Sequence, residues 1–169
     1  MGLLDFFRPD PSAQWPSYSR GPLRFDLTQG SVDGFVFGDA AEYLRRLGRP
    51  DNRRPFRENT FRYLGLGLIV DIEHDRIEGF ELVISPQVYP SVDMQGCVVE
   101  MACPSGAVLD MTGGVLWERV AAELGDPAEV DDEDPDDLVL TYRLDALTVE
   151  FECRRDRLVA HINVYRNPN

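Results

Sequence analysis

The chain has 169 residues, which is long enough to bury a hydrophobic core without the help of a metal or a disulfide. Its 43% hydrophobic and 28% charged residues are close to the averages of folded soluble domains and exclude a disordered chain. A formal net charge of -13 disfavours nucleic acid and anionic membranes as partners and favours a basic protein, although many proteins are acidic for solubility alone.

Residues 1–22 predict an irregular lead-in to the folded part of the chain. The apolar patch at positions 3–7 is interrupted by Asp5 and followed by Arg8, so it is too short and too charged for a signal peptide or a membrane span. Phe6 stands where a myristoylation signal requires Ser or Thr. We therefore expect a cytoplasmic protein that has no membrane partner.

The cysteine pattern also indicates a reducing compartment. Cys97, Cys103 and Cys153 are odd in number and form no C-x-x-C pair, which fits neither a disulfide framework nor a zinc site. Cys97 and Cys103 flank an apolar run, where cysteine usually serves as a small core side chain. We expect all three thiols to be reduced.

A short motif occurs twice in the chain. Residues 43–50 and 120–127 both end in Leu-Gly-x-Pro after a helix-like apolar pattern. Glycine after the last apolar position allows a left-handed C-cap, and the proline prevents the helix from continuing. The motif predicts two helices that end at Leu47 and Leu124.

Each predicted helix is followed by a polar loop and then by three strand-like runs. Apolar residues alternate with polar ones within these runs, as expected of strands with one buried face. The runs cover residues 60–63, 66–73 and 77–85 in the first half, and 138–143, 147–153 and 158–165 in the second half.

Further landmarks match between the two halves. Tyr63 corresponds to Tyr142, and both halves have an Asp-Arg turn between the second and third runs. Aligning these turns sets Phe80 against His161, so the sequence predicts a bulge or a one-residue shift in the third strands. Short apolar runs that precede each helix predict a hairpin in each half; these runs cover residues 23–27 and 34–37, then 97–102 and 107–111.

The sequence thus predicts an α+β fold made of two tandem repeats, residues 23–90 and 91–169. Each repeat would be a hairpin, a helix and a three-stranded antiparallel meander, with the helix packed on one sheet face and the other face open. The alternation leaves undecided whether the two repeats form one continuous sheet or two packed sheets.

A tandem of helix-then-meander units of about 77 residues, each with a Leu-Gly-x-Pro helix exit, resembles the β-lactamase inhibitor protein fold. It is also similar to the small outer-membrane assembly lipoproteins. The resemblance covers residues 34–85 and 107–165, and it implies that the open sheet face grips another protein. Members of these families are secreted and carry disulfides or a lipid-bearing cysteine. Because this chain shows neither feature, we do not expect a β-lactamase or the outer membrane as its target.

The sequence offers no convincing catalytic set, and we expect no enzyme and no cofactor. His74 lies in a predicted turn and His161 in a predicted strand, and we interpret each as a lone exposed or edge histidine. Gly65 and Gly67 predict a turn or bulge, because no phosphate-binding helix follows them.

The polar loops of the two halves differ in charge. The second loop is acidic and lacks the glycine and terminal glutamate of an EF-hand, so it is better explained as a solvated loop than as a calcium site. Its acidic residues are Glu129, Asp131, Asp132, Glu133, Asp134, Asp136 and Asp137. The first loop is rich in arginine, with Arg49, Arg53, Arg54, Arg57 and Arg62. The two loops attract each other between molecules, head to tail, or give the protein two ends with different binding preferences, or are independently solvated.

The open face is predicted to be acidic and therefore suited to a basic protein. The predicted binding residues are Asp71, Glu73, Glu81, Glu150, Glu152 and Tyr165 on the sheet, with Asp131, Asp132, Glu133 and Asp134 in the loop. The sharpest form of this hypothesis is an inhibitor or immunity-type protein that acts by binding. The alternative is a self-associating structural subunit, for example a homodimer that buries its open sheet faces.

Overall fold

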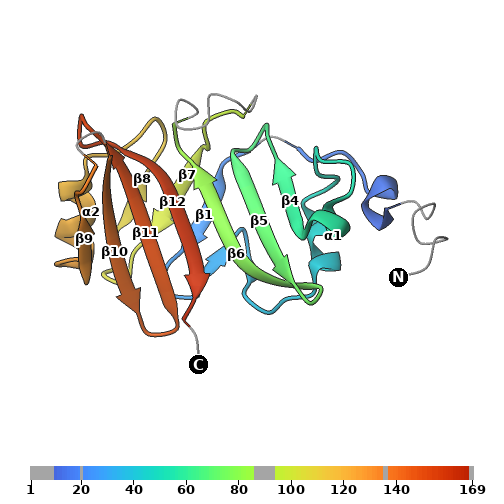
Figure 1. Cartoon of the computed structure of the whole chain (residues 1–169), viewed down its shortest axis with the longest axis horizontal. Helices are drawn as coiled ribbons and strands as arrows, with labels where there is room; N and C mark the ends of the chain where they lie inside the picture. The colour runs from blue at the N-terminus through green and yellow to red at the C-terminus, as the bar shows by residue number, and fades with distance from the viewer. Residues whose placement is uncertain (1–9, 20, 86–93, 135–136, 168–169) are drawn as a thin grey trace.

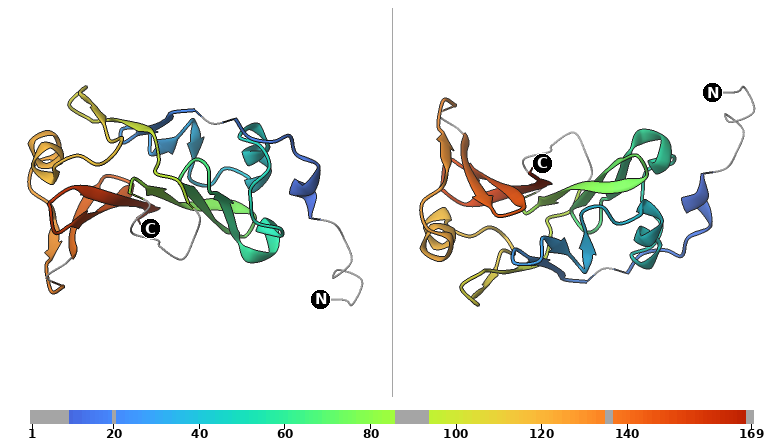
Figure 2. Two further views of the ribbon diagram at one scale, coloured as in Figure 1. Left: turned by 90° about the horizontal axis from the view of Figure 1, so that it is seen from above. Right: turned by 90° about the horizontal axis from the view of Figure 1, so that it is seen from below.

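The fold consists of two β-sheets packed face to face around one hydrophobic core (Figures 1 and 2). The computed structural model describes residues 10–19, 21–85, 94–134 and 137–167. Strands and short helices alternate along the chain, so the predicted α+β class is confirmed. The apolar start at positions 3–7 lies outside the described residues.

The larger sheet has seven antiparallel strands in the order β4-β5-β6-β12-β11-β10-β9. It joins the two predicted meanders through the pair β6·β12, so both halves of the chain share one continuous sheet. The predicted runs agree with the observed strands to within about two residues, and β9 was not predicted. The strands are β4 (Thr60–Tyr63), β5 (Leu68–Glu73), β6 (Arg76–Val83), β9 (Glu129–Asp131), β10 (Asp137–Leu144), β11 (Leu147–Arg154) and β12 (Val159–Arg166).

The smaller sheet has five strands in the order β3-β2-β1-β7-β8. Its neighbours are antiparallel except for the central pair β1·β7, which is parallel. The strands are β1 (Leu23–Asp26), β2 (Ser31–Val32), β3 (Phe35–Val36), β7 (Val99–Ala102) and β8 (Val108–Asp110). The predicted hairpin of the second half is present as β7·β8, whereas in the first half the predicted runs at 23–27 and 34–37 do not pair directly, because an unpredicted strand, β2, lies between them. Residues of this sheet belong to the same buried cluster as those of the larger sheet.

The prediction that a helix covers each meander is not confirmed. The five-stranded sheet provides most of the cover on the inner face of the seven-stranded sheet (Figure 2). The helices are too short to do so: η3 (Ala41–Arg46) is a 3-10 helix, and α2 (Trp117–Leu124) has about two turns. Their ends, at Leu47 and at Leu124 before Gly125, agree with the prediction from the Leu-Gly-x-Pro motif.

The lead-in is also more structured than predicted. It contains a 3-10 helix, η2 (Pro11–Gln14), and a further short helix, α1 (Pro55–Glu58), lies in the first polar loop. Trp15 follows η2 and is buried, with its ring 5.8 Å from that of Phe61 and close to Phe56. An aromatic residue of the lead-in therefore completes the core at the β4 end of the sheet.

The two halves share a specific side-chain contact. The hydroxyl of Tyr63 on β4 donates a hydrogen bond to the carbonyl of Gly48, which follows η3. The hydroxyl of Tyr142 on β10 donates to the carbonyl of Gly125, which follows α2. In both halves this bond joins the end of the helix to the first strand of the meander.

The orientation of the two halves limits the repeat. The meanders meet through the antiparallel pair β6·β12, whereas the hairpins meet through the parallel pair β1·β7. Because the two sheets stack face to face, a rotation that reverses the direction of the meander strands also reverses the direction of the hairpin strands. No single rotation can therefore superpose both hairpins and both meanders. A common origin of the two halves stays a prediction.

The predicted shift in the third strands is present. Ile72 pairs with Ile77 in the first half, and Cys153 pairs with Val159 in the second. The second turn is therefore one residue longer. Both pairs of strands have the same register irregularity just beyond the turn. The longer second turn is therefore the reason why Phe80 faces the core while His161 lies on the other side of the sheet.

Burial follows the predicted alternation. On β5, Leu68, Val70 and Ile72 are buried, while Asp71 is half-buried and Glu73 is exposed. The three cysteines are buried and free, as predicted for core thiols. Gly67 has a φ of 65° in the turn after β4, which confirms the turn predicted at Gly65 and Gly67.

A candidate protein-binding face

The candidate site is the open face of the larger sheet, meaning the side that faces away from the five-stranded sheet. Within the described residues, no helix or strand lies over its central strands β5, β6, β12 and β11 (Figure 2). The register places eight carboxylates on this side, together with the cations Arg62, Arg143 and Arg154. These carboxylates are Asp71, Glu73, Glu81, Glu129, Asp131, Asp137, Glu150 and Glu152.

The centre of the open face holds a buried histidine between two carboxylates. His161 is 1% exposed, and its strand β12 lies between β6 and β11. Its Nδ1 lies 3.1 Å from Oε2 of Glu152, and its Nε2 lies 3.6 Å from Oε2 of Glu81. Asn163 donates a hydrogen bond of 3.0 Å from Nδ2 to Oε1 of Glu152. Side chains of three adjacent strands thus fix one another at the junction of the two meanders.

The interpretation of His161 as an exposed or edge histidine is therefore wrong, whereas His74 does lie in an exposed turn. The error arises because outward-facing residues of the central strands are shielded by their own neighbours. The signal was present in the sequence: pairing the last two strands across their turn places Glu152 opposite His161.

The two carboxylates determine the protonation of His161. Burial alone would lower the pKa of its imidazole, but Glu152 and Glu81 outweigh burial and raise the pKa to about 9. The same contact lowers the pKa of Glu152 below its usual value, against the opposing effect of burial. At neutral pH the group is therefore an imidazolium flanked by carboxylates, and neither ring nitrogen is free to act as a general base.

Asp71 experiences the opposite environment. It lies across from Gly79 on β6, at the position equivalent to that of Glu152 across from His161, so no imidazolium lies opposite it. Burial, and then the charge of Glu81, raise the pKa of its carboxyl, while a hydrogen bond of 3.1 Å from the Thr60 hydroxyl and the charge of Arg62 partly offset this. The first half of the face therefore holds a carboxylate whose charge is poorly compensated.

The second half of the open face is hollowed. A depression of about 490 Å³ lies over β9 to β12, and its lining includes Glu129, Asp131, Arg143, Glu150 and Tyr165. The Tyr165 hydroxyl donates to Oε1 of Glu150 at 2.5 Å, and Arg143 lies 3.7 Å from Glu129 in an exposed pair. Burial, and then Glu150, raise the pKa of Tyr165 to about 12. This hollow combines carboxylates with an aromatic ring.

The structure brings together some of the predicted binding residues and separates others. The six predicted on the sheet share the open face, and Asp131 reaches the hollow from β9. Asp132, Glu133 and Asp134 continue beyond β9 at the edge of the sheet, and four strands lie between this edge and β5. The predicted residues therefore form an acidic face and a separate acidic edge.

The described residues contain neither a metal-binding cluster nor a membrane-spanning helix. These residues contain no group of three or more His, Cys, Asp or Glu side chains that is arranged to hold a metal ion. None of the helices in the described ranges is long and apolar enough to cross a membrane.

Comparisons with known proteins inform the fold. No family model matches the chain, and no curated protein matches it. Among solved structures, it is similar to a DUF4309 family protein (YjgB) from Bacillus subtilis subsp. subtilis str. 168, with a TM-score of 0.51 and 14% sequence identity. The match covers 80% of this chain and 84% of that chain. At this identity, the likeness shows the fold alone.

Proposed function

We propose that the protein is a non-enzymatic binding module that holds a basic protein against its open sheet face. The observation that carries this proposal is the set of eight carboxylates on an uncovered sheet surface, which extends from β5 to β9. A surface of one charge sign steers a partner of opposite sign and disfavours acidic competitors.

The arrangement of the side chains supports binding. Glu152 is held by His161 and Asn163, Glu150 by Tyr165, and Asp71 by Thr60. Carboxylates that are already ordered lose little side-chain entropy when a partner binds, which favours affinity. Tyr165, which is 37% exposed, adds an amphipathic aromatic surface of the kind that is enriched at protein interfaces.

The state of His161 supports a positioning role in this module. Its two nitrogens face carboxylates, and its pKa of about 9 keeps it protonated at neutral pH. It neutralises part of the repulsion between Glu81 and Glu152 and so allows carboxylates to be packed at the centre of the sheet. We interpret His161 as the residue that positions this part of the face.

An inhibitor or immunity-type role is the sharpest form of the proposal. It rests on the resemblance of the predicted repeats to the β-lactamase inhibitor protein fold, in which an open sheet face grips another protein. In this form, the partner would be a basic toxin or enzyme of the same cell. A homodimer through the open face is disfavoured by the repulsion between two acidic surfaces.

The test compares two charge reversals of equal size on different faces. Glu73→Lys with Glu129→Lys changes exposed positions of the open face and leaves the His161 contacts intact. Glu42→Lys with Glu100→Lys makes the same change in net charge at exposed positions elsewhere, in η3 and on β7. Partners are captured from a lysate of the native organism, and their association rates are then measured with each variant across a salt series.

We expect the open-face variant to slow association by roughly tenfold or more at low salt, and we expect the control to bind like the unchanged protein. Added salt should reduce the difference between them, because exposed charges are screened over about 8 Å at physiological ionic strength. An acidic partner, or equal effects of the two variants, would show that the open face does not steer binding.

A further inference from the structure

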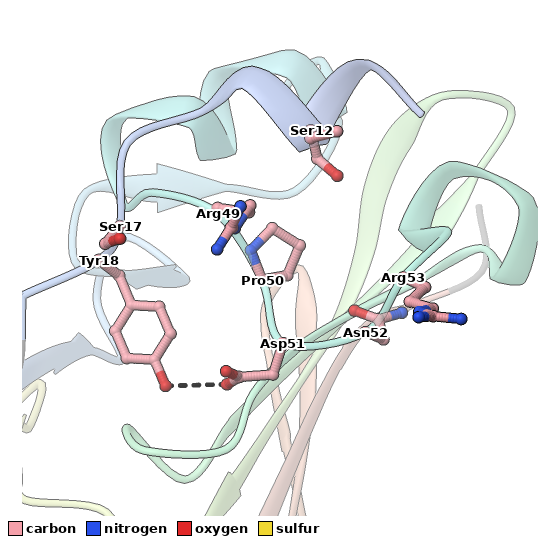
Figure 3. Close-up of a pocket in the computed structure, with 9 residues that line it drawn as sticks. Ser12, Ser17, Tyr18, Arg49, Pro50, Asp51, Asn52 and Arg53 are labelled. Carbon is pink, nitrogen blue, oxygen red and sulfur yellow. Dashed lines mark hydrogen bonds between the residues drawn. The ribbon is translucent and has the colours of Figure 1, made fainter. Parts of the chain in front are cut away.

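A second polar cavity lies at the opposite end of the larger sheet from β9. We call it the arginine pocket and define it by Ser12, Ser17, Tyr18, Arg49, Asn52 and Arg53, which line it together with Asp51 and Pro50. Its volume is about 560 Å³. In Figure 3, Arg49 lies on the Tyr18 side of the pocket and Arg53 lies on the other side, beside Asn52.

The backbone of the arginine pocket is fixed on several sides. The Arg49 amide donates to the Pro16 carbonyl at 2.6 Å, and a Cβ on Gly48 would come within 2.6 Å of the Tyr18 nitrogen. The Tyr18 hydroxyl donates to Oδ2 of Asp51 at 2.8 Å, as Figure 3 shows. Asn52 Nδ2 donates to the Thr60 carbonyl at 2.7 Å. The pocket is therefore a built feature of the lead-in, the η3–α1 loop and β4.

Its two guanidinium groups lack an opposite charge of their own. Within the described part of the chain, neither Arg49 nor Arg53 makes an ion pair. The one carboxylate that lines the pocket, Asp51, already accepts hydrogen bonds from Tyr18 and from the Leu64 amide. Two cations without ion pairs that line one pocket are suited to carboxylate oxygens from outside.

The opposite end of the molecule carries such carboxylates. We call Asp131, Asp132 and Glu133 the acidic edge; all three are exposed at or just after β9, the outermost strand. Asp131 accepts a hydrogen bond from the Glu133 amide. No ion pair is found for Asp132 or Glu133 among the residues that the structure describes.

We propose that the arginine pocket of one molecule binds carboxylates of the acidic edge of a second copy. The pocket lies beside β4 and the acidic edge beside β9, the two outer strands of the seven-stranded sheet, so the two cannot meet within one molecule (Figure 1). Like ends repel and unlike ends attract, which specifies a head-to-tail contact. This proposal does not rest on the proposed function of the open face.

Side chains make this contact, not strand pairing. The outer edge of β4 is already occupied, because the Asp51 amide donates to the Arg62 carbonyl and the Arg62 amide donates to Oδ1 of Asn52. A second sheet cannot add to an edge whose backbone groups are bonded in this way. Each copy still has one free pocket and one free acidic edge, so a head-to-tail contact that does not close forms an open chain of copies.

Salt should affect this association in two directions. Copies with a net charge of -13 repel each other at low ionic strength, where fields extend over about 30 Å at 0.01 M salt. At physiological ionic strength this range falls to about 8 Å, so the local pairs remain while the overall repulsion is screened. Exposed ion pairs are individually weak, so we expect weak association with a maximum at intermediate salt.

The test uses two complementary variants. Arg49→Gln with Arg53→Gln disables the pocket, and Asp132→Asn with Glu133→Gln disables the acidic edge. A matched control, Arg24→Gln with Arg119→Gln, removes two exposed arginines from other parts of the surface. Circular dichroism first establishes that each variant is folded. Sedimentation velocity then gives the mass of each protein, alone and in an equimolar mixture of the two disabled variants, over a range of concentrations.

We expect the unchanged protein and the control to grow in mass with concentration beyond a dimer, and each disabled variant to stay monomeric. The mixture should form a 1:1 heterodimer and stop there, because only one functional pocket and one functional edge remain between the two proteins. A monomeric mixture overturns the proposal. So does an Arg49-dependent thermal shift with citrate in a protein that does not self-associate, because the pocket would then take a small carboxylate instead of a second copy.

Discussion

The hydroxyl of Tyr63 donates a hydrogen bond of 3.2 Å to the carbonyl of Gly48. Tyr142 and Gly125 make the equivalent bond at 3.3 Å. Both glycines follow a helix and have a positive φ, 119° at Gly48 and 81° at Gly125. They differ in their surroundings, because Gly48 packs against the backbone of the lead-in and Gly125 has nothing within 4 Å of its missing Cβ.

The two glycines should therefore respond differently to alanine. Gly125→Ala should cost about 1–3 kcal/mol of stability, because a φ of 81° with a ψ of -158° lies in a region that is occupied almost only by glycine. Gly48→Ala should cost more, about 3 kcal/mol or above, because its Cβ would also collide with the backbone of Tyr18. Urea denaturation of the two variants measures both values. Equal losses of stability would show that the backbone of the lead-in moves aside at little cost to make room for a Cβ at position 48.

A second prediction concerns His161. His161→Gln should lower the free energy of unfolding at pH 6 by roughly 1–3 kcal/mol, because it leaves Glu81 and Glu152 without their buried cation. The matched control is His74→Gln, since the His74 side chain is 90% exposed. This control should have almost no effect.

The pH dependence of stability gives a further check on His161. Because folding raises its pKa from 6.5 to about 9, its contribution is complete below pH 6.5 and is lost as the pH rises through about 9. The unchanged protein should therefore lose stability between these values, and the His161→Gln variant should not. The same loss in both proteins would assign the effect to other groups.

A third prediction concerns Asp71, whose pKa is raised by burial and by Glu81. A carboxyl with a raised pKa in the folded state destabilises the fold once it ionises. Asp71→Asn keeps an acceptor for the Thr60 hydroxyl and removes the charge, so it should stabilise the protein by about 0.5–2 kcal/mol at pH 7. The gain should disappear near pH 3, where the aspartic acid is neutral in both states. Glu73→Gln, at an exposed position on the same strand, serves as the control in thermal unfolding at both pH values.

A fourth prediction concerns the cysteines. Burial raises the pKa of Cys97 and of Cys153 to about 12 and also raises that of Cys103, so the reactive thiolate is scarce in the folded protein. Labelling with a thiol reagent at pH 8 should be slow in the native state and should reach three groups in denaturant without a reductant. Fewer than three groups would indicate a disulfide.

The strands could be predicted well from the sequence because their alternation is local. The alternation predicts that Leu68, Val70 and Ile72 are buried, and each of them faces the core in the structure. The Gly-Pro stops also located the helix ends. The cover of the sheet could not be predicted in this way, because the pairing of β1 with β7 depends on contacts between residues far apart in the chain.

The candidate site was predicted in part for the same reason. Asp71, Glu81 and Glu152 could be assigned to an outward face from alternation alone. The network around His161 needs the order of strands, in which β12 lies between β6 and β11. The arginine pocket needs the lead-in to fold back on Arg49, and a composition rich in proline gives no indication of that contact.

The two central strand pairs have a consequence for a chain that is cut between residues 85 and 94. Each fragment would expose two strand edges, β6 and β1 on one and β12 and β7 on the other. One edge of each fragment needs an antiparallel partner and the other needs a parallel one. Two such fragments can complete both sheets only in one arrangement, which makes this protein a natural candidate for a split reporter that regains its fold when its pieces are brought together.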